Sequence, residues 1–376
     1  MNLAVRDIRH SSGRFVLTCL GLGLLLGVVL SMVGIYRGLI DDALVLVRSP
    51  SADLWVVEDG SRGPFAEASR LPTDVRDIVA RLPGVTASGA VTYQSIELAA
   101  GSRTLRALIV GYEIGRLGGP PGIAQGRDIM RAHFEMVADE RSGLRLGDRI
   151  PLARDSYTIV GLTRGGVDSG GNPVLYVTLK DAQNIQFALQ GAAARSQAMR
   201  GPKADRNTVN AVIARLASGV SADAMAESVR QWKHFGALTQ ADQEAMLLTS
   251  VVEKARKQIG LFTAILLIVS AVIISLIIYT MTMDKAREIA TLKLIGAPNR
   301  TIVGLILQEA VSMGSLGFLF GAAIIASVGD RFPRRVILEA TDAFALAGVV
   351  LLVCVLASAL GVRFALRIDP AKALAG

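Results

Sequence analysis

Four long apolar runs divide the chain, and each run is bounded by charged or polar residues. They cover residues 15–36, 259–283, 301–329 and 343–362. A helix needs about 20 consecutive apolar residues to cross roughly 30 Å of hydrocarbon, and every run meets this length. The pattern therefore predicts four transmembrane helices.

The first apolar run follows a basic segment, as the apolar region of a cleaved signal peptide would. It is longer than the roughly 7–15 residues of such a region, and no pair of small residues at cleavage spacing follows Tyr36. We therefore expect a retained first helix, preceded by a cytoplasmic amphipathic N-terminus over residues 1–14.

Basic residues concentrate in the segments that would share one side of the membrane. An even number of spans places residues 1–14, 284–300 and 363–376 together, and all three are rich in Lys and Arg. Positive charge marks the cytoplasmic side. The short loop over residues 330–342 also contains three arginines, but acidic residues offset them. We expect this loop and residues 37–258 to be periplasmic, and residues 363–376 to form a cytoplasmic tail.

Residues 37–258 contain short apolar runs of strand type and short helical patterns. Strands are predicted at 52–57, 105–110, 157–161 and 174–179, and helices at 73–82 and 221–235. The polar, Gly-containing stretch at 189–206 predicts a flexible surface excursion. Residues 240–258 predict a stalk helix that leads into the second span. The fold class is therefore an α-helical membrane protein with a large two-lobed α+β domain inserted between transmembrane helices 1 and 2.

Composition narrows the function. Hydrophobic residues make up 51% of the chain and charged residues 19%, which fits neither a soluble enzyme nor a bundle wholly embedded in lipid. The net charge is +8, but aromatic residues are only 5% and do not interleave with a basic stripe, so anionic lipid is a better counter-charge than nucleic acid. Cys19 and Cys354 both lie in apolar runs, so no disulfide or metal site is expected.

No catalytic motif is convincing. The turn at 168–173, DSGGNP, approaches the nucleophile loop of trypsin-like proteases, but Val167 replaces a glycine, Asn172 is inserted, and only His133 and His234 could serve as a base. A Gly-rich hairpin turn explains these residues better. The chain also lacks a phosphate-binding G-x-x-x-x-G-K-[ST] loop. We expect a non-enzymatic subunit without a cofactor, with ATP and Mg²⁺ on a partner.

Two features inside the spans are candidates for a role. Small residues recur at Gly23 and Gly27 in the first span and at Gly317 and Gly321 in the third, a spacing that lets helix backbones approach closely. The alternative is that these glycines are merely tolerated. Glu309 is the one acidic residue within a span, which makes it a functional candidate. Its alternative is a hydrogen bond between helices with no role in proton transfer.

The cytoplasmic loop at 284–300 is predicted to contain a short amphipathic helix. Ile289, Leu292 and Ile295 recur every third residue, and charged residues such as Arg287 and Glu288 lie between them. Gly296, followed by Pro298, is a helix stop signal. The alternative is an interfacial helix that only tethers two spans.

At this segment the chain resembles the MacB/FtsX-type permeases, which pair with a cytoplasmic ABC ATPase. The resemblance rests on KAREIATLKLIGA at 285–297, LQEA at 307–310 and the glycine-rich span that contains it. It extends along nearly the whole chain, through RFVLTCLGLG at 14–23, the block at 137–148, IVG at 159–161 and ALRIDPAKAL at 365–374. The layout is most similar to that of DevC-like four-span permeases without a fused ATPase.

The resemblance implies that residues 284–300 form a coupling helix that docks on the ATPase. Arg287, Glu288 and Gly296 are then the positions of interest, whereas Ala290 and Leu294 depart from the family pattern. It also implies a second permease copy, a periplasmic membrane-fusion adaptor and a location in the bacterial inner membrane. The implied function is export of cargo by ATP-driven motion. The alternatives are FtsX-like mechanotransmission that activates a cell-wall hydrolase, and extraction of lipoproteins.

Overall fold

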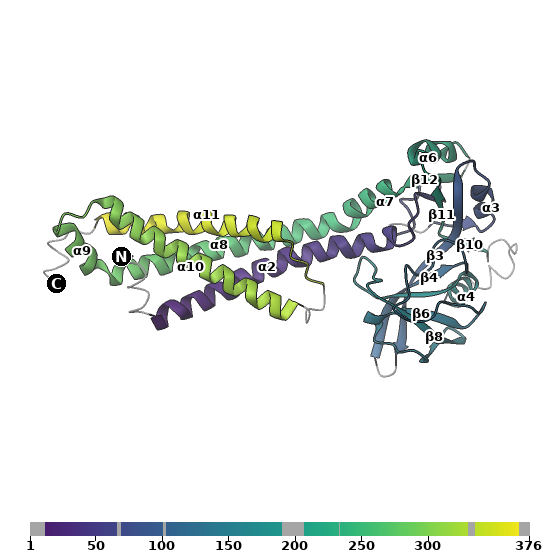
Figure 1. The fold of residues 1–376 in the computed structure, drawn as a ribbon, viewed down its shortest axis with the longest axis horizontal. Helices are drawn as coiled ribbons and strands as arrows, with labels where there is room; N and C mark the ends of the chain where they lie inside the picture. The colour runs from purple at the N-terminus through teal and green to yellow at the C-terminus, as the bar shows by residue number, and fades with distance from the viewer. Residues whose placement is uncertain are drawn as a thin grey trace. The chain divides into compact units, whose positions relative to one another are not determined.

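The computed structural model describes residues 12–65, 69–100, 103–189, 207–232, 234–329 and 335–367 (Figure 1). The chain divides into two compact units, one of residues 1–38 and 255–376 and the other of residues 39–254. Most of the predicted excursion at 189–206, most of the N-terminus and most of the cytoplasmic tail lie outside the described residues.

The first unit contains long apolar helices. These are α2 (Ser12–Arg48), whose residues 39–48 belong to the second unit, α8 (Glu253–Asp284), α10 (Asn299–Val328) and α11 (Ala340–Arg367). Among the described residues, four helices are long and apolar enough to cross a membrane. The short helix α9 (Ala286–Leu294) connects α8 to α10. A mixed α/β unit lies between the first and second of the four, so the predicted fold class is confirmed.

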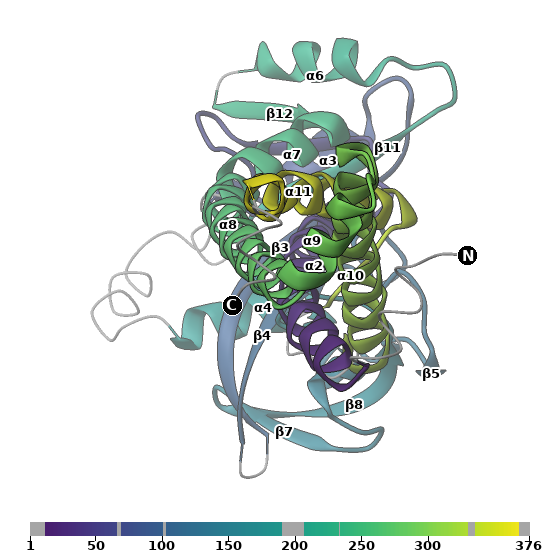
Figure 2. The same ribbon diagram turned by 90° about the vertical axis from the view of Figure 1, so that its left-hand side faces the viewer.

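Glycines allow α2 and α10, whose ribbons lie next to each other in Figure 2, to approach closely. A Cβ atom at Gly321 would lie 2.6 Å from the carbonyl oxygen of Gly23, and one at Gly23 would lie 2.9 Å from the carbonyl oxygen of Gly317. Both distances are too short for a real side chain. The two backbones therefore touch along Gly23 and Gly27 on one helix and Gly317 and Gly321 on the other.

The remaining helices follow in the order α10, α11, α8. A Cβ at Gly314 of α10 would overlap the Cys354 sulfur of α11, and a Cβ at Gly361 of α11 would lie 2.7 Å from Ile278 of α8. The hydroxyl of Ser275 in α8 also donates a hydrogen bond of 3.1 Å to the carbonyl oxygen of Ala357 in α11. Because lipid supplies no hydrophobic drive between helices, such close packing and interhelical hydrogen bonds hold the unit together.

The second unit is built on a ten-stranded sheet in the order β12-β1-β11-β3-β4-β9-β6-β8-β5, with β7 paired to β8. The strands are β1 (Leu54–Glu58), β3 (Val85–Ala100), β4 (Arg103–Tyr112), β5 (Gln125–Gly126), β6 (Glu135–Asp139), β7 (Arg149–Leu152), β8 (Asp155–Thr163), β9 (Val174–Thr178), β11 (Ala211–Leu216) and β12 (Phe235–Thr239). A separate ribbon pairs β2 (Leu71–Pro72) with β10 (Thr208–Val209). The helices are α3 (Val75–Ala80), α4 (Leu179–Leu189), α6 (Ala222–Arg230) and α7 (Gln240–Leu247).

One long strand, β3, joins two separate cores. Its first half pairs with β11, and its second half pairs with β4. One core contains buried residues of β1, β11, α3 and α6, whereas another contains those of β4, β6, β8 and β9. The unit therefore has two lobes that share a strand.

Helical structure continues from the second unit into α8. The side chain of Thr239 and that of Asp242 form a capping box at the start of α7, and a π-helical turn at Leu248–Val252 links α7 to α8. Beside it, the guanidinium of Arg48, at the end of α2, donates hydrogen bonds of 2.9 and 2.8 Å to the Glu244 carboxylate of α7. The end of α2 and helix α7 are therefore bound to each other within the second unit.

One buried carboxylate should make the stability of the second unit depend on pH. Hydrogen bonds from the Arg127 guanidinium, together with the backbone N–H groups of Met130 and Arg131, lower the pKa of Glu135 to about 2. Because the unfolded value is about 4.3, this stabilisation is present above pH 4.3 and is lost as the pH falls toward 2.

We therefore expect Glu135→Gln to destabilise the unit at neutral pH, with a deficit that shrinks between about pH 4.3 and 2. Both tryptophans, Trp55 and Trp232, lie in this unit, so their fluorescence in the full-length chain reports its unfolding by urea. The matched control is Glu97→Gln at an exposed position of β3. A deficit for Glu135→Gln that is constant over this pH range would contradict the assignment.

Candidate functional site

Helix α9 ends in a glycine-dependent cap. Gly296 has a φ of +89°, its N–H donates to the carbonyl of Lys293 at 3.1 Å, and the N–H of Ala297 donates to that of Leu292 at 2.9 Å. This pair of bonds is a Schellman motif, in which a left-handed residue follows the helix. Pro298 then precedes the first residue of α10. Gly296 therefore fixes the corner between α9 and α10 through its backbone.

A buried side chain holds the middle of α9 against the helix bundle. Ile289 is 5% exposed and belongs to the same core cluster as Ile302 and Ile306 of α10 and Ala365 of α11. Ala290 beside it is fully buried. This face of α9 packs within its own unit and is not available to a partner.

Two lysines fasten the ends of α9. Lys285, just before the helix, places its ammonium 2.8 Å from the Glu309 carboxylate of α10, and both side chains are largely buried. Lys293 near the other end donates hydrogen bonds of 3.0 Å to the carbonyl oxygens of Ala365 and Leu366. These carbonyls belong to the last turn of α11, where unpaired acceptors and the helix dipole favour a cation. Thus α9 is attached to α10 at one end and to α11 at the other.

The Lys285 contact bears on the role of Glu309. A lone carboxylate within a span would be a candidate proton carrier, but this one lies against a cation on the adjacent connection. A structural ion pair accounts for a charge at this depth without any proton-transfer role.

The exposed residues of α9 lie at helical spacing on one face. They are Arg287, Glu288, Thr291, Leu294 and Ile295, which we call the outer face of α9. Leu294 is 61% exposed and Ile295 is 79% exposed, so two large apolar side chains lie next to charged ones at the end of the helix. An apolar anchor beside polar groups is the composition of a protein-binding surface.

The three apolar residues predicted to share one face of the helix differ in their exposure in the structure. Ile289 is buried, Leu292 is half-buried and Ile295 is exposed. Each step of three residues turns about 60° short of a full helix turn, so Ile289 and Ile295 lie about 120° apart around the axis. Leu294, which the three-residue spacing passed over, shares the outer face with Ile295.

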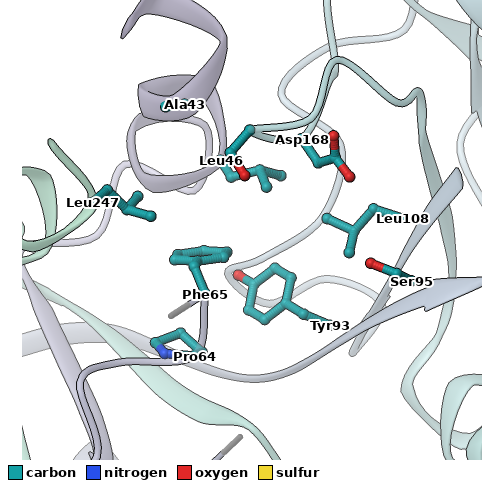
Figure 3. Close-up of a pocket in the computed structure, with 10 residues that line it drawn as sticks. Ala43, Leu46, Pro64, Phe65, Tyr93, Ser95, Leu108, Asp168 and Leu247 are labelled. Atoms are coloured by element: carbon teal, nitrogen blue, oxygen red, sulfur yellow. The ribbon is translucent and has the colours of Figure 1, made fainter. Parts of the chain in front are cut away.

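The second unit has a cavity of about 150 Å³ beside the end of α2 (Figure 3). Its wall includes the rings of Phe65 and Tyr93, whose centroids are 4.6 Å apart. The others that line it are Ala43, Leu46, Pro64, Ser95, Leu108, Asp168, Ser169 and Leu247. Most of the residues that line the cavity are apolar, and its one carboxylate is engaged within its own turn.

The turn at 168–173 is the segment whose sequence is close to the nucleophile loop of trypsin-like proteases. One carboxylate oxygen of Asp168 accepts hydrogen bonds of 2.8 Å from the N–H groups of Gly170 and Asn172. His133, one of the two candidate bases, instead lies 2.7 Å from a carboxylate oxygen of Asp181. The geometry is that of a Gly-rich hairpin turn. Within the described residues, no cluster of three His, Cys, Asp or Glu side chains is placed to hold a metal ion.

Comparison with known proteins matches both parts of the chain. The profile of the MacB-like periplasmic core domain matches residues 15–232, and that of the FtsX-like permease C-terminal region matches residues 260–370. An uncharacterised ABC transporter permease of Mycobacterium tuberculosis is 23% identical over 374 residues, 99% of each chain. Another, of Mycobacterium bovis, is 24% identical over 379 residues, again 99% of each.

Two solved structures are similar to part of the chain. The periplasmic region of MacB from Actinobacillus actinomycetemcomitans covers 54% of this chain and 95% of its own, with 13% identity and a TM-score of 0.36. The extracellular domain of the ABC-type transporter YknZ from Gram-positive bacteria covers 50% and 100%, with 9% identity and a TM-score of 0.34.

The Lys285–Glu309 pair can be tested by removing one charge or both. Because a single change removes one partner of a largely buried ion pair, Lys285→Met or Glu309→Leu should each destabilise the helical unit by about 3–5 kcal/mol. The double variant should be close to the wild type in stability, since a buried pair replaced by apolar groups is often neutral. Loss of helical circular dichroism in a graded denaturing-detergent titration measures this. Additive losses in the double variant would refute the ion-pair role.

Proposed function

The chain belongs to the MacB/FtsX-type family of ABC transporter permeases, and on this basis we propose that it transmits ATP-driven motion from a separate cytoplasmic ATPase to its extracytoplasmic domain. It would act in the bacterial inner membrane as a multi-pass subunit that does no chemistry itself. ATP and Mg²⁺ would be bound by the partner.

The observation that carries this proposal is the outer face of α9. Leu294 and Ile295 are exposed at the end of a short helix, on a loop that the charge distribution places in the cytoplasm. Lipid does not explain their position next to Arg287 and Glu288 as well as a protein partner does, because the charged pair would remain solvated at the margin of a contact whose centre is apolar.

The attachments of α9 make it suited to transmit force. A helix held only by its two flanking loops could tilt without moving its neighbours. Here Lys285 binds α10, Lys293 binds the end of α11, and Ile289 is embedded between them. Displacement of α9 by a partner would therefore displace α10 and α11 with it.

We further propose that the motion serves export, in which two permease copies act with a membrane-fusion adaptor. Support comes from the match of residues 15–232 to the MacB-like periplasmic core domain, which places a domain of this type between the first two spans. The extracytoplasmic domain would then be the moving part that engages cargo or adaptor.

The docking surface can be tested by truncating its apolar anchors. Leu294→Ala and Ile295→Ala should each weaken association with the ATP-binding subunit that co-purifies from native membranes by about tenfold, which corresponds to about 1.4 kcal/mol. Arg287→Glu should weaken it less, since a charge at the margin of an interface contributes little to affinity.

Leu352→Ala is the matched control, because Leu352 of α11 is also 59% exposed but lies within a span. Affinity is measured by titrating the purified subunit onto the permease in nanodiscs, together with ATP turnover. If both anchor variants bind as tightly as the control, α9 is only a tether between two spans.

A further inference from the structure

Residues 335–339, the segment immediately before α11, lie directly on α2, and we call them the strap. The N–H of Ile337 donates a hydrogen bond of 3.0 Å to the carbonyl oxygen of Gly34. A Cβ at Gly34 would overlap the side chain of Val336, and one at Gly38 would overlap the carbonyl oxygen of Arg335. Two glycines four residues apart on α2 therefore admit the strap at backbone distance.

Arg37 closes this contact from the same face of α2. Its Nε and Nη2 donate hydrogen bonds of 2.6 and 2.9 Å to the two carboxylate oxygens of Asp342 in the first turn of α11. Nη2 also lies 3.2 Å from the Glu339 carboxylate of the strap. A guanidinium that holds a carboxylate through two parallel bonds fixes orientation as well as distance.

We propose that Arg37 is a positioning residue that makes α2 move with α11, so that motion applied to α9 reaches the extracytoplasmic domain through α2. This inference rests on the proposed function. The coupling helix is attached by an ion pair and hydrogen bonds to α10 and α11, and none of these polar contacts of α9 is to α2. On the extracytoplasmic side, the strap and Arg37 are the polar joint between α11 and α2.

Helix α2 extends beyond its contact with the strap and α11, and this extension is what makes the contact relevant to the second unit. The helix does not stop near the predicted end of the span at Tyr36 but continues to Arg48. At that end of the helix, the Arg48 guanidinium donates hydrogen bonds to the Glu244 carboxylate of α7 within the second unit. Helix α2 is therefore bound to α11 through Arg37 and to α7 through Arg48.

The exposure of the Arg37 pair separates positioning from stability. The side chains of Arg37 and Asp342 are 37% and 23% exposed, and solvated ion pairs contribute little to folding. If the pair served stability alone, its loss would change little. As a positioning contact, its loss should leave fold and ATPase binding intact while α2 and α11 become independent.

The test compares Arg37→Gln and Gly38→Ala with Gly21→Ala, a matched control on α2 where an added Cβ would meet nothing within 4 Å. Spin labels at Val33→Cys in α2 and Phe344→Cys in α11, in a chain with Cys19 and Cys354 replaced by alanine, report the distance between the helices. The full-length permease is measured in nanodiscs with its co-purified ATP-binding subunit, with and without trapped ATP.

In the wild type and the Gly21→Ala control, we expect one narrow distance distribution that ATP does not change. In Arg37→Gln and Gly38→Ala, it should broaden and shift on ATP trapping, while binding of the ATP-binding subunit stays within about twofold. The charge exchange Arg37→Asp with Asp342→Arg should restore the narrow distribution.

Distributions for both variants that match the wild type in both states would overturn the proposal. Failure of the proposed function is distinguishable, because then no ATP-binding subunit would associate even with the wild type. The label distance without ATP would still test the joint, since its distribution should already be broadened in Arg37→Gln and Gly38→Ala.

Discussion

The attachment of α9 to the two helices that follow it is the interaction on which the rest of the structure's function depends. Lys285 pairs with the Glu309 carboxylate of α10, and Lys293 donates hydrogen bonds to two carbonyl oxygens at the end of α11. Ile289, between the two lysines, is buried. Because both ends and the middle of the helix are held, its outer face presents side chains in one fixed orientation. A surface of this kind can receive a load and pass it on.

The close helix contacts explain how such a load could be carried further. Where Gly23 and Gly27 meet Gly317 and Gly321, the backbones touch, and there are no long side chains whose rotamers could absorb a displacement. The ion pairs at Arg37 and Arg48 then set the two ends of the outer segment of α2. If the proposed motion occurs, packing would decide which helices move together, and the charge pairs would keep them aligned.

Much of this architecture could be predicted from sequence because hydropathy reports membrane spans directly. Four apolar runs, their basic flanks and the paired glycines of the first and third spans are local properties of the chain. The same holds for α9, whose glycine stop follows from the left-handed conformation that a helix end requires. A ten-stranded order, in contrast, depends on pairings between distant segments.

Several features could not be found in this way. Strand β3 was missed because its first half, rich in Ala, Ser and Gly, lacks the apolar alternation of a strand, although pairing with both β11 and β4 stabilises the whole strand. The strap contact of Gly34 and Gly38 joins segments some 300 residues apart. The partners of Lys285 and Lys293 likewise depend on where helices end in space. An amphipathic pattern predicted a helix but did not show which of its apolar residues are exposed.

The most direct test of force transmission is a distance between the two units in the assembled complex. Met130 in the second unit is 75% exposed and Phe344 in the first is 78% exposed, so both can carry spin labels in the cysteine-free chain. The account predicts that trapping ATP on the partner shifts this distance in the wild type, and that the shift disappears when Leu294 and Ile295 are both replaced by alanine. An ATPase that stays bound and turns over ATP while the wild-type distance remains unchanged would contradict it.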